Sequence, residues 1–294
     1  MRIEKANAKI NVYLDVVSKR DNGYHNIVSI MHTVSLCDLV SIGFLPGSET
    51  SISLSSEGIS DMPTDAKNLA WRAASSFLRE TGLSGRVSIH IEKNIPMAAG
   101  LAGGSADAAA VLRGMNTLCG NLLSVEALCA LGTTLGADVP FCIRGGSALV
   151  TGIGDEMADA ACMPMSDIVI ACMGDGVSTP WAYGALDEKY SHFSIPHSTT
   201  AQSDKILHAW EDGDATVAFD HFFNIFEQVV PSKQPYVERI KREMYACGAL
   251  KAMMSGSGPS VFGIFSSKEA AVLAQEKLEA MGARAFVCTP TKAY

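Results

Sequence analysis

The feature that most constrains this sequence is a run of small residues at 96–110, PMAAGLAGGSADAAA, placed between two regular segments. Alternating apolar residues predict a strand at 87–92 just before it, and alanine-rich sequence predicts a helix beginning at about Ser105. Small residues let a backbone approach a ligand closely, and the free N–H groups of a helix start attract anions. The segment therefore predicts a strand–loop–helix unit that cradles phosphate groups.

Two common phosphate-binding motifs do not describe this loop. No Gly-Lys-Ser or Gly-Lys-Thr follows it, so it is not a Walker A loop, and its glycines do not fit the G-x-G-x-x-G fingerprint of dinucleotide sites. Because glycine-rich loops are common, spacing alone also leaves open a plain flexible connection between a strand and a helix.

The rest of the chain alternates strand and helix patterns, which predicts a mixed α and β protein. A change from Gly-rich to acidic, Ala/Met-rich sequence places the domain boundary near 155–165, so we predict domains at 1–158 and 159–294. The expected strands are 8–16, 27–35, 39–44, 167–173, 249–254, 260–265 and 284–288, and the expected helices are 66–80, 124–135, 180–190, 203–211, 215–220, 235–246 and 267–281.

Charge and hydropathy exclude several classes of protein. The formal net charge is -8, from 23 basic and 31 acidic residues without a basic stripe, so we expect no nucleic-acid partner. No apolar run approaches the length of a membrane span, and the first residues lack the apolar segment of a signal peptide. We therefore expect a cytoplasmic protein with no membrane partner.

Cysteine and histidine spacing gives no metal motif. The eight cysteines contain no C-x-x-C pair, and the seven histidines form no H-x-H or H-E-x-x-H cluster. We expect the cysteines to be reduced and packed as small hydrophobic residues, and the sequence leaves the ligands of any metal unknown.

Three blocks of sequence together resemble the GHMP kinases. The loop resembles their motif P-x-x-x-G-L-(small)-G-G-S-(small)-(D/N)-A-A, AKINVYL at 8–14 resembles their first motif, and MSGSGPSVF at 254–262 resembles their third. The resemblance implies an α+β fold of two domains, an N-terminal mixed α/β domain and a C-terminal ferredoxin-like α/β domain. It also implies a small-molecule kinase that uses ATP and Mg²⁺.

Further blocks resemble the members of this family that act on 4-diphosphocytidyl-2-C-methyl-D-erythritol. These blocks are DNGYH at 21–25, NLAWRAA at 68–74, LGADVPF at 135–141 and GGSA at 145–148. They imply ATP-dependent phosphorylation of the 2-hydroxyl of that small molecule in non-mevalonate isoprenoid precursor synthesis. We expect a monomer or a weak homodimer.

The sequence departs from the family pattern at two places. Alanines stand at 98, 99, 102 and 106, where many relatives have glycine or serine, and alanine has less conformational freedom than glycine. The segment Asn224-Ile225-Phe226-Glu227 replaces the more usual Asn-Asp-(Leu/Phe)-Glu, so the role of that segment stays open.

The resemblance assigns catalysis to Lys9 and Asp138. The apolar neighbours of Asp138 would desolvate a carboxylate that orients or deprotonates a hydroxyl, and Lys9 would stabilise charge as the phosphoryl group moves. Without the family context, Asp138 also reads as a turn aspartate and Lys9 as a lysine on a solvated strand face.

The nucleotide site follows from the same resemblance. Asn68 and Lys93 match positions near the adenine and the ribose, and Gly256, Ser257 and Gly258 are expected to form a turn that faces the phosphates. An ordinary hairpin is the alternative for that turn. The residues expected to hold the ATP phosphates are Pro96, Met97, Ala98, Ala99, Gly100, Leu101, Ala102, Gly103, Gly104, Ser105 and Ala106.

Substrate recognition is expected from Tyr24, His25 and Tyr183, with aromatic rings stacked on cytosine and the histidine reading the edge of the base. Trp181 competes with Tyr183 as the second stacking ring, and packing in the core is the alternative for both. The remaining predicted contacts to substrate are Asn11 and Thr179.

Two rival functions remain at this stage. Another kinase of the family, of the homoserine or mevalonate type, would share the phosphate loop but would not need aromatic rings for a cytosine. A non-catalytic nucleotide-binding relative would share the fold, but it would have no use for both Lys9 and Asp138.

Overall fold

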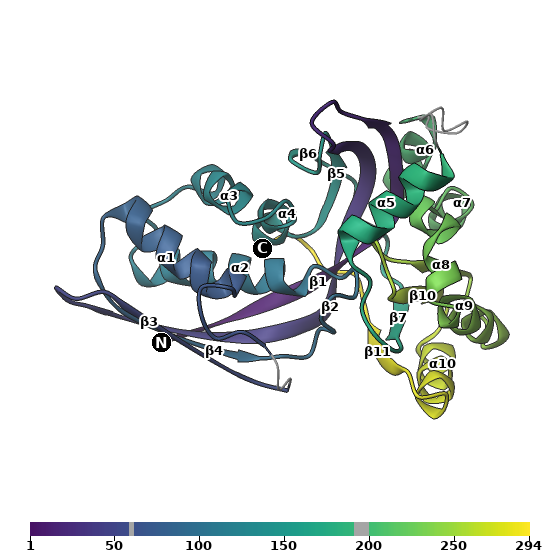
Figure 1. Cartoon of the computed structure of the whole chain (residues 1–294). Helices are drawn as coiled ribbons and strands as arrows, with labels where there is room; N and C mark the ends of the chain where they lie inside the picture. The colour runs from purple at the N-terminus through teal and green to yellow at the C-terminus, as the bar shows by residue number, and fades with distance from the viewer. Residues whose placement is uncertain (59–61, 191–199) are drawn as a thin grey trace.

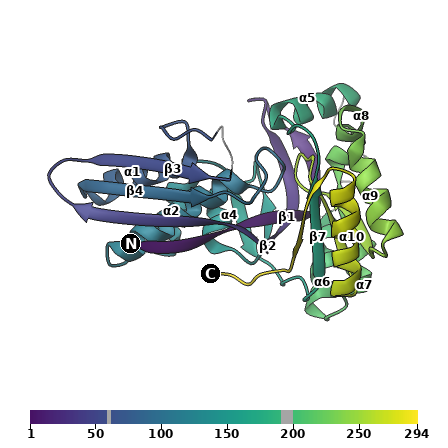
Figure 2. The same cartoon turned by 90° about the horizontal axis from the view of Figure 1, so that it is seen from below.

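The computed structural model describes residues 1–58, 62–190 and 200–294, which form two mixed α/β domains lying side by side (Figure 1). In Figure 2 the long strand β1 (Arg2–Lys19) runs from the N-terminal domain as far as the sheet of the C-terminal domain. This strand carries one of the two predicted catalytic residues and connects the two halves of the molecule.

The N-terminal domain is built on one twisted sheet. Within the described residues its order is β3 (Ser51–Glu57), β4 (Gly85–Glu92), β2 (His25–Pro46), β1 and the short β8 (Phe223–Asn224). Strands β5 (Ser147–Thr151) and β6 (Glu156–Asp159) extend it from β2. Four helices cover one face: α1 (Leu69–Thr81), α2 (Gly103–Leu118), α3 (Val125–Thr133) and α4 (Val139–Arg144).

The C-terminal domain has a four-stranded antiparallel sheet in the order β11 (Arg284–Cys288), β7 (Asp167–Cys172), β10 (Val261–Phe265), β9 (Lys251–Met254). Helices α9 (Tyr236–Ala246) and α10 (Lys268–Ala280) cover its outer face (Figure 2). This strand order, with a helix in each crossover, is the ferredoxin-like arrangement that the resemblance implied. The remaining elements are α5 (Thr179–Lys189), α6 (Thr200–Glu211), α7 (Ala215–Phe219), a 3₁₀ turn (Ile225–Gln228) and α8 (Val230–Lys233).

The alternation of apolar and polar residues at 8–16 is typical of a half-buried strand, but strand β1 is buried on both faces over these residues. Its apolar residues Ile10 and Val12 pack with Ile168 and Phe262 of the C-terminal sheet. The opposite face lies under the loop before α2, so even Lys9 is only 4% exposed. Alternation predicted the strand and the two faces correctly, but not the second layer that covers the polar face.

Several element boundaries also differ from the predictions. The two strands expected at 27–35 and 39–44 are one strand, β2. Its pairing with β1 continues across residues 36–38, with a shift of register between Asn7 and Lys9. Strands β3, β5, β6 and β8 and the helices α4 and α8 were not predicted. They are short, and most take their stability from neighbours distant in sequence.

Within the described residues, two later segments of the chain pair with the N-terminal domain. Strand β8 pairs in parallel with β1 at Tyr13 and Leu14. Residues 289–294 return to the N-terminal domain, where isolated bridges join Val34 to Pro290 and Gly145 to Ala293. The domain boundary at 158 therefore stays a prediction, because segments after this residue contribute to the first domain.

All eight cysteines are free; Cys129, Cys142 and Cys288 are buried as expected of small hydrophobic residues, whereas Cys162 is exposed. In the part of the chain that the structure describes, no helix has both the length and the apolar character needed to cross a membrane.

Candidate active site

A cavity of about 740 Å³ opens where the two domains meet, and most of the predicted site residues line it. Its walls come from β1, the loop before α2, the start of α5 and the turn at 256–257. The predicted residues among its lining are Lys9, Asn11, Asn68, Lys93, all of 96–105, Asp138, Thr179, Tyr183, Gly256 and Ser257. Segments far apart in sequence thus converge on one concave surface, as a small-molecule site requires.

The loop before α2 presents the helix N-terminus to this cavity. Ala98 and Ala102 adopt left-handed backbone conformations, with φ of 51° and 56°, at two of the four positions where alanine departs from the family motif. Ala102 is the N-cap and offers no side-chain hydrogen bond, so the first N–H groups of α2 have no capping side chain. The loop thus reaches left-handed conformations with alanine in place, and its uncapped amides can bind an anion.

Glycine at position 100 is required by contact as well as by conformation. Its φ is 78°, and a Cβ there would lie 2.2 Å from the backbone oxygen of Ser255. Backbone hydrogen bonds join the same loop to both domains: Lys9 N donates to Leu101 O at 3.1 Å and Ser260 N to Ala99 O at 3.2 Å. The loop is thus held from two sides rather than free to move as a plain connection.

Lys9 and Asp138 meet in the cavity. The Nζ of Lys9 lies 4.0 Å from Oδ2 of Asp138, although 129 positions (138 minus 9) separate them in sequence. Lys9 also donates to Oδ1 of Asn11 at 2.6 Å and to the carbonyl of Gly100 at 3.1 Å. The ammonium is therefore oriented by β1 and by the phosphate loop, with Asp138 as its charged partner.

Asp138 is the N-cap residue of α4, but its carboxylate accepts no capping hydrogen bond. Its side chain is 33% exposed, whereas that of Lys9 is 5% exposed. A carboxylate that its own helix does not use, open to a cavity and beside a buried cation, is able to accept a proton from a bound hydroxyl.

Lys93 lies deeper and is held by two carboxylates that sequence reasoning missed. Its Nζ bonds Oδ2 of Asp38 at 2.5 Å and Oδ2 of Asp107 at 2.7 Å, and all three residues are buried. Asp38 also accepts from the backbone N–H groups of Asn94 and Ile95 at 2.6 and 2.8 Å. The triad anchors the segment that enters the phosphate loop to β2 and to α2. Lys93 lies where a strand leads into a loop, and nothing in the neighbouring sequence indicates that it is buried with two carboxylates.

Burial and charge set the ionisation of this triad. Two carboxylates share one ammonium, and desolvation raises the pKa of Asp107 to about 7 against the opposing attraction of Lys93. The attraction of Asp107 and Asp38 raises the pKa of Lys93 despite a desolvation that acts to lower it. Asp107 Oδ1 is buried without a hydrogen-bond partner within the described residues.

Of the two candidate stacking rings, Tyr183 lines the cavity, together with Phe226, and Trp181 does not. Tyr183 packs edge-on against Phe226 at 4.9 Å and is stacked with His25 at 4.8 Å between ring centroids. Burial, with the charge of Asp138 adding to it, raises the pKa of Tyr183 to about 12. Trp181 instead lies under Lys233, whose Nζ is 4.3 Å from the ring centroid.

His25 is buried behind Tyr183, with its Nε2 at 2.7 Å from Oδ1 of Asp187. Lys19 bonds the other oxygen of Asp187 at 2.5 Å. Against desolvation, which acts to raise it, the hydrogen bonds from Lys19 and His25 lower the pKa of Asp187. Sequence reasoning missed this aspartate, which orients the predicted recognition histidine.

Four predicted site residues are outside the cavity lining: Tyr24, His25, Ala106 and Gly258. Tyr24 is 60% exposed at the turn between β1 and β2, His25 lies behind Tyr183, and Ala106 is buried one residue beyond the lining segment of α2. The structure therefore brings the phosphate-binding and catalytic residues together, while contact of Tyr24 and His25 with substrate stays a prediction.

The segment 224–227, whose role the sequence left open, supports the turn at 254–258. Asn224 Nδ2 donates to the carbonyls of Met254 and Gly256 at 2.7 and 2.9 Å. Oε1 of Glu227 accepts from Met254 N at 2.8 Å. Ile225, at the position where relatives usually have aspartate, is buried among apolar residues. The segment thus shapes the part of the cavity wall formed by this turn, where Ser257 Oγ lies 2.9 Å from Thr179 Oγ1.

The residues that line the cavity fit a nucleoside triphosphate together with a divalent cation. The α2 N-terminus supplies amides for phosphates, and a Cβ at position 100 would fill the narrow contact between the loop and the 255–258 turn. Ser105 and Asp138 place oxygen donors at the cavity wall, the ligand type that Mg²⁺ prefers.

Comparison with known families finds matches in both halves of the chain. The family described as GHMP kinases N terminal domain matches residues 68–146, and the family described as GHMP kinases C terminal matches residues 211–284. The first match contains the phosphate loop and Asp138, and the second contains the turn at 256–258.

Individual proteins give a narrower likeness. The chain is 44% identical over 277 residues to the 4-diphosphocytidyl-2-C-methyl-D-erythritol kinase of Caldicellulosiruptor saccharolyticus, covering 94% of this chain and 92% of that protein. It is 41% identical over 269 residues to the same kinase of Geobacter metallireducens, covering 91% and 90%.

Solved structures agree. A crystal structure of 4-(cytidine 5'-diphospho)-2C-methyl-D-erythritol kinase matches with a TM-score of 0.81 at 32% identity, covering 98% of this chain and 99% of that one. Homoserine kinase from Cytophaga hutchinsonii matches with a TM-score of 0.74 at 19% identity, covering 99% and 94%, which shows a shared fold alone.

Proposed function

The chain belongs to the GHMP kinase family, and from this premise we propose that it phosphorylates 4-diphosphocytidyl-2-C-methyl-D-erythritol on its 2-hydroxyl, with ATP as phosphoryl donor. The proposed reaction belongs to non-mevalonate isoprenoid precursor synthesis. The observation that carries the proposal is the meeting of Lys9 and Asp138, 4.0 Å apart, beside the amides of the phosphate loop.

ATP supplies the phosphoryl group, and the loop at 96–106 would hold its phosphates. The left-handed turns at Ala98 and Ala102 direct the amides of the α2 N-terminus into the cavity, where a positive helix dipole favours negative charge. Asn68 and Lys93 line the same cavity and would contact the adenosine part. We propose Mg²⁺ as the accompanying cation, held chiefly by phosphates and water, as is usual for this ion.

Asp138 would accept the proton of the substrate hydroxyl. The oxygen of that hydroxyl forms a bond to the γ-phosphorus of ATP as the bond from the γ-phosphorus to ADP breaks and ADP departs. Lys9 would stabilise the charge that builds on the transferring group, because it is fixed by Asn11 and Gly100 before substrate arrives. Phosphoryl transfer asks for positioning and charge stabilisation more than for covalent chemistry, and both are supplied by groups already in place.

Specificity for a cytidyl group would come from the cavity wall formed by β1 and the start of α5. Tyr183 offers its ring to the cavity, Thr179 and Asn11 offer polar contacts, and His25 lies directly behind Tyr183. For Tyr24 and His25 to contact the base, their side chains would have to turn toward the cavity when substrate binds.

The test is release of ADP by the purified chain with each alcohol in turn: the cytidyl substrate, homoserine and mevalonate, with and without Mg²⁺. We expect turnover only with the cytidyl substrate and only with the cation. Turnover of homoserine or mevalonate alone would reassign the substrate within the family, and ATP binding without any turnover would favour a non-catalytic relative.

The setting of the reaction is also proposed. The substrate is a charged, water-soluble molecule, which suits a cytoplasmic enzyme. We propose a monomer or a weak homodimer, since Lys9, Asp138 and the phosphate loop meet within a single chain.

A further inference from the structure

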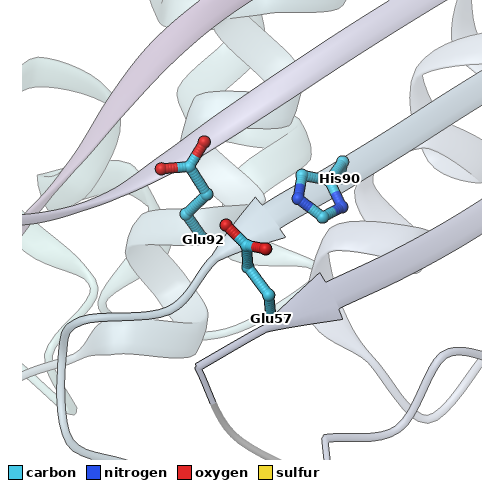
Figure 3. Close-up of side chains that lie close together, drawn as sticks. All are labelled: Glu57, His90 and Glu92. Atoms are coloured by element: carbon cyan, nitrogen blue, oxygen red, sulfur yellow. The ribbon is translucent and has the colours of Figure 1, made fainter.

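A second group of potential ligands lies on the outer face of the N-terminal sheet, away from the helices and the catalytic cavity. Glu57 ends β3, and His90 and Glu92 project from β4 on the side opposite the buried Val87, Ile89 and Ile91. Their potential ligand atoms all lie within 4.8 Å of one another. Figure 3 shows the three side chains converging above the sheet.

The strand register brings two like charges together. Glu57 is paired directly with Glu92 across the parallel strands β3 and β4. Neither carboxylate makes an ion pair or a side-chain hydrogen bond with any residue in the described ranges 1–58, 62–190 and 200–294. Opposed like charges destabilise a sheet, so a bound cation here would relieve a repulsion that the fold otherwise leaves in place.

The histidine of the group is already oriented. Nδ1 of His90 lies 2.9 Å from Oγ of Ser55, its cross-strand neighbour. In Figure 3 the other edge of the ring faces the two glutamates. Histidines that bind metal commonly donate one ring N–H to a neighbouring oxygen, which fixes the ring and leaves the second nitrogen free to coordinate. Ser55 is placed to accept that hydrogen bond.

We propose that Glu57, His90 and Glu92 form a site for a divalent transition-metal ion of the Zn²⁺ class. An imidazole together with two carboxylates favours such ions over Mg²⁺ or Ca²⁺, which prefer sites made wholly of oxygen. Small rotations of the side chains bring ligand atoms within 4.8 Å of one another to metal distances of about 2.0–2.2 Å, with water completing the coordination.

The site would join the end of β3 to β4. From Glu57 the chain runs on to Met62 and Pro63, which line the catalytic cavity. An ion bound at this point would stabilise the folded protein, because it binds the assembled strands and not the unfolded chain.

The test is calorimetric titration of the full chain, free of nucleotide, with ZnCl₂ and separately with CoCl₂. We expect one ion per chain, an affinity at least tenfold weaker in Glu57→Gln, and loss of binding in His90→Ala. The melting temperature should rise with metal in the unaltered protein and not in His90→Ala. The Co²⁺ spectrum should lack thiolate charge-transfer bands, since no cysteine is a ligand.

Two matched controls separate this site from incidental binding. Cys162→Ser removes the exposed thiol, and Glu49→Gln removes one carboxylate elsewhere on the surface; both should bind as the unaltered chain does. Equal binding by His90→Ala and the unaltered chain, loss in Cys162→Ser, or no saturable binding at all would overturn the proposal. If His90→Ala is unstable, Glu57→Gln takes its place as the test variant. Glu57 is exposed, and circular dichroism checks that this variant keeps its fold.

Discussion

At the scale of single residues, the catalytic proposal depends on the surroundings of Asp138. The residue is the N-cap of α4 yet contributes no capping bond, and its carboxylate faces the cavity beside Lys9. An N-cap aspartate that does not cap stabilises its helix little, so its position is better explained by chemistry than by folding.

We expect Asp138→Ala to lower kcat by about 10²–10⁴-fold, the usual contribution of a positioned proton acceptor. Stability should change little, because that side chain makes no capping hydrogen bond to the helix. Steady-state kinetics give kcat, and calorimetry gives ATP affinity, which should persist. A variant with nearly unaltered kcat would remove Asp138 from the mechanism.

The two candidate stacking rings can be separated by a pair of variants. Tyr183→Ala should raise KM for the cytidyl substrate at least tenfold, because ring stacking on a base contributes about 1–3 kcal/mol. Trp181→Ala, whose ring lies under Lys233 and not in the cavity lining, should leave that KM nearly unchanged. The reverse order of effects in initial-rate measurements would show that Trp181 contacts the base.

Asp107 predicts a dependence of stability on pH. Its pKa is raised to about 7 in the folded protein, against an ordinary value of about 3.9 in the unfolded chain. The folded state therefore holds the proton more tightly between these values. It follows that the contribution of Asp107 to stability is full below about pH 4 and is lost as the pH rises toward about 7.

Urea unfolding of the unaltered chain and of Asp107→Asn at several pH values isolates this effect. The free energy of unfolding of the unaltered chain, minus that of the variant, should fall between about pH 5 and 7 by up to about 1.4 kcal/mol per pH unit and then level off. A difference that stays constant or rises would show that the carboxyl ionises normally.

At the scale of elements, the loop before α2 shows how a local motif depends on distant support. Its amides face the cavity because of left-handed residues at 98 and 102, which are properties of the loop itself. Its position depends on contacts with Lys9 on β1 and Ser260 beside β10. The motif is local, but its place in the site is tertiary.

Gly100→Ala should therefore cost more than an ordinary glycine substitution. The new Cβ would meet the carbonyl of Ser255 at 2.2 Å, whereas in the control Gly213→Ala, which has a similar φ of 76°, no atom lies within 4 Å. Backbone strain alone destabilises such a site by more than about 0.4–1 kcal/mol. We expect a clearly larger loss of stability and weaker ATP binding in Gly100→Ala, measured by urea unfolding and calorimetry. Equal losses would mean that the loop moves freely away from Ser255.

At the scale of the whole molecule, residues 289–294 connect the domains and contact the elements that carry both catalytic residues. Tyr294 Oη accepts from Asn7 N at 3.1 Å and lies 3.0 Å from Lys5 O, both on β1. Its backbone N donates to the carbonyl of Arg144, at the end of α4, at 2.9 Å. The guanidinium of Arg113 lies 3.6 Å from its ring centroid. The segment thus joins β1 to α4.

Tyr294→Phe should lower the free energy of unfolding by about 1 kcal/mol, because the hydroxyl is lost while the ring can still pack on Arg113. Tyr24→Phe is the control, since its side chain is exposed and outside the cavity lining. Urea unfolding compares the two. If Tyr294→Phe were as stable as the control, the hydroxyl contacts to β1 would contribute nothing to the fold.

The sequence by itself determined what neighbouring residues decide together. The phosphate loop, the helix after it and the alternation of β1 follow from backbone sterics, helix ends and side-chain periodicity, which act over a few residues. The motifs and their order also led to the family, and with it to the two-domain fold.

Only the tertiary structure decided which of these pieces meet. It buried the polar face of β1, placed Lys9 at 4.0 Å from Asp138, gave Lys93 two carboxylates and chose Tyr183 over Trp181 for the cavity wall. The physical reason is that burial, desolvation and ion pairing depend on residues tens to hundreds of positions apart. No short-range pattern in a single sequence records such contacts, because they arise only when the sheets and helices pack.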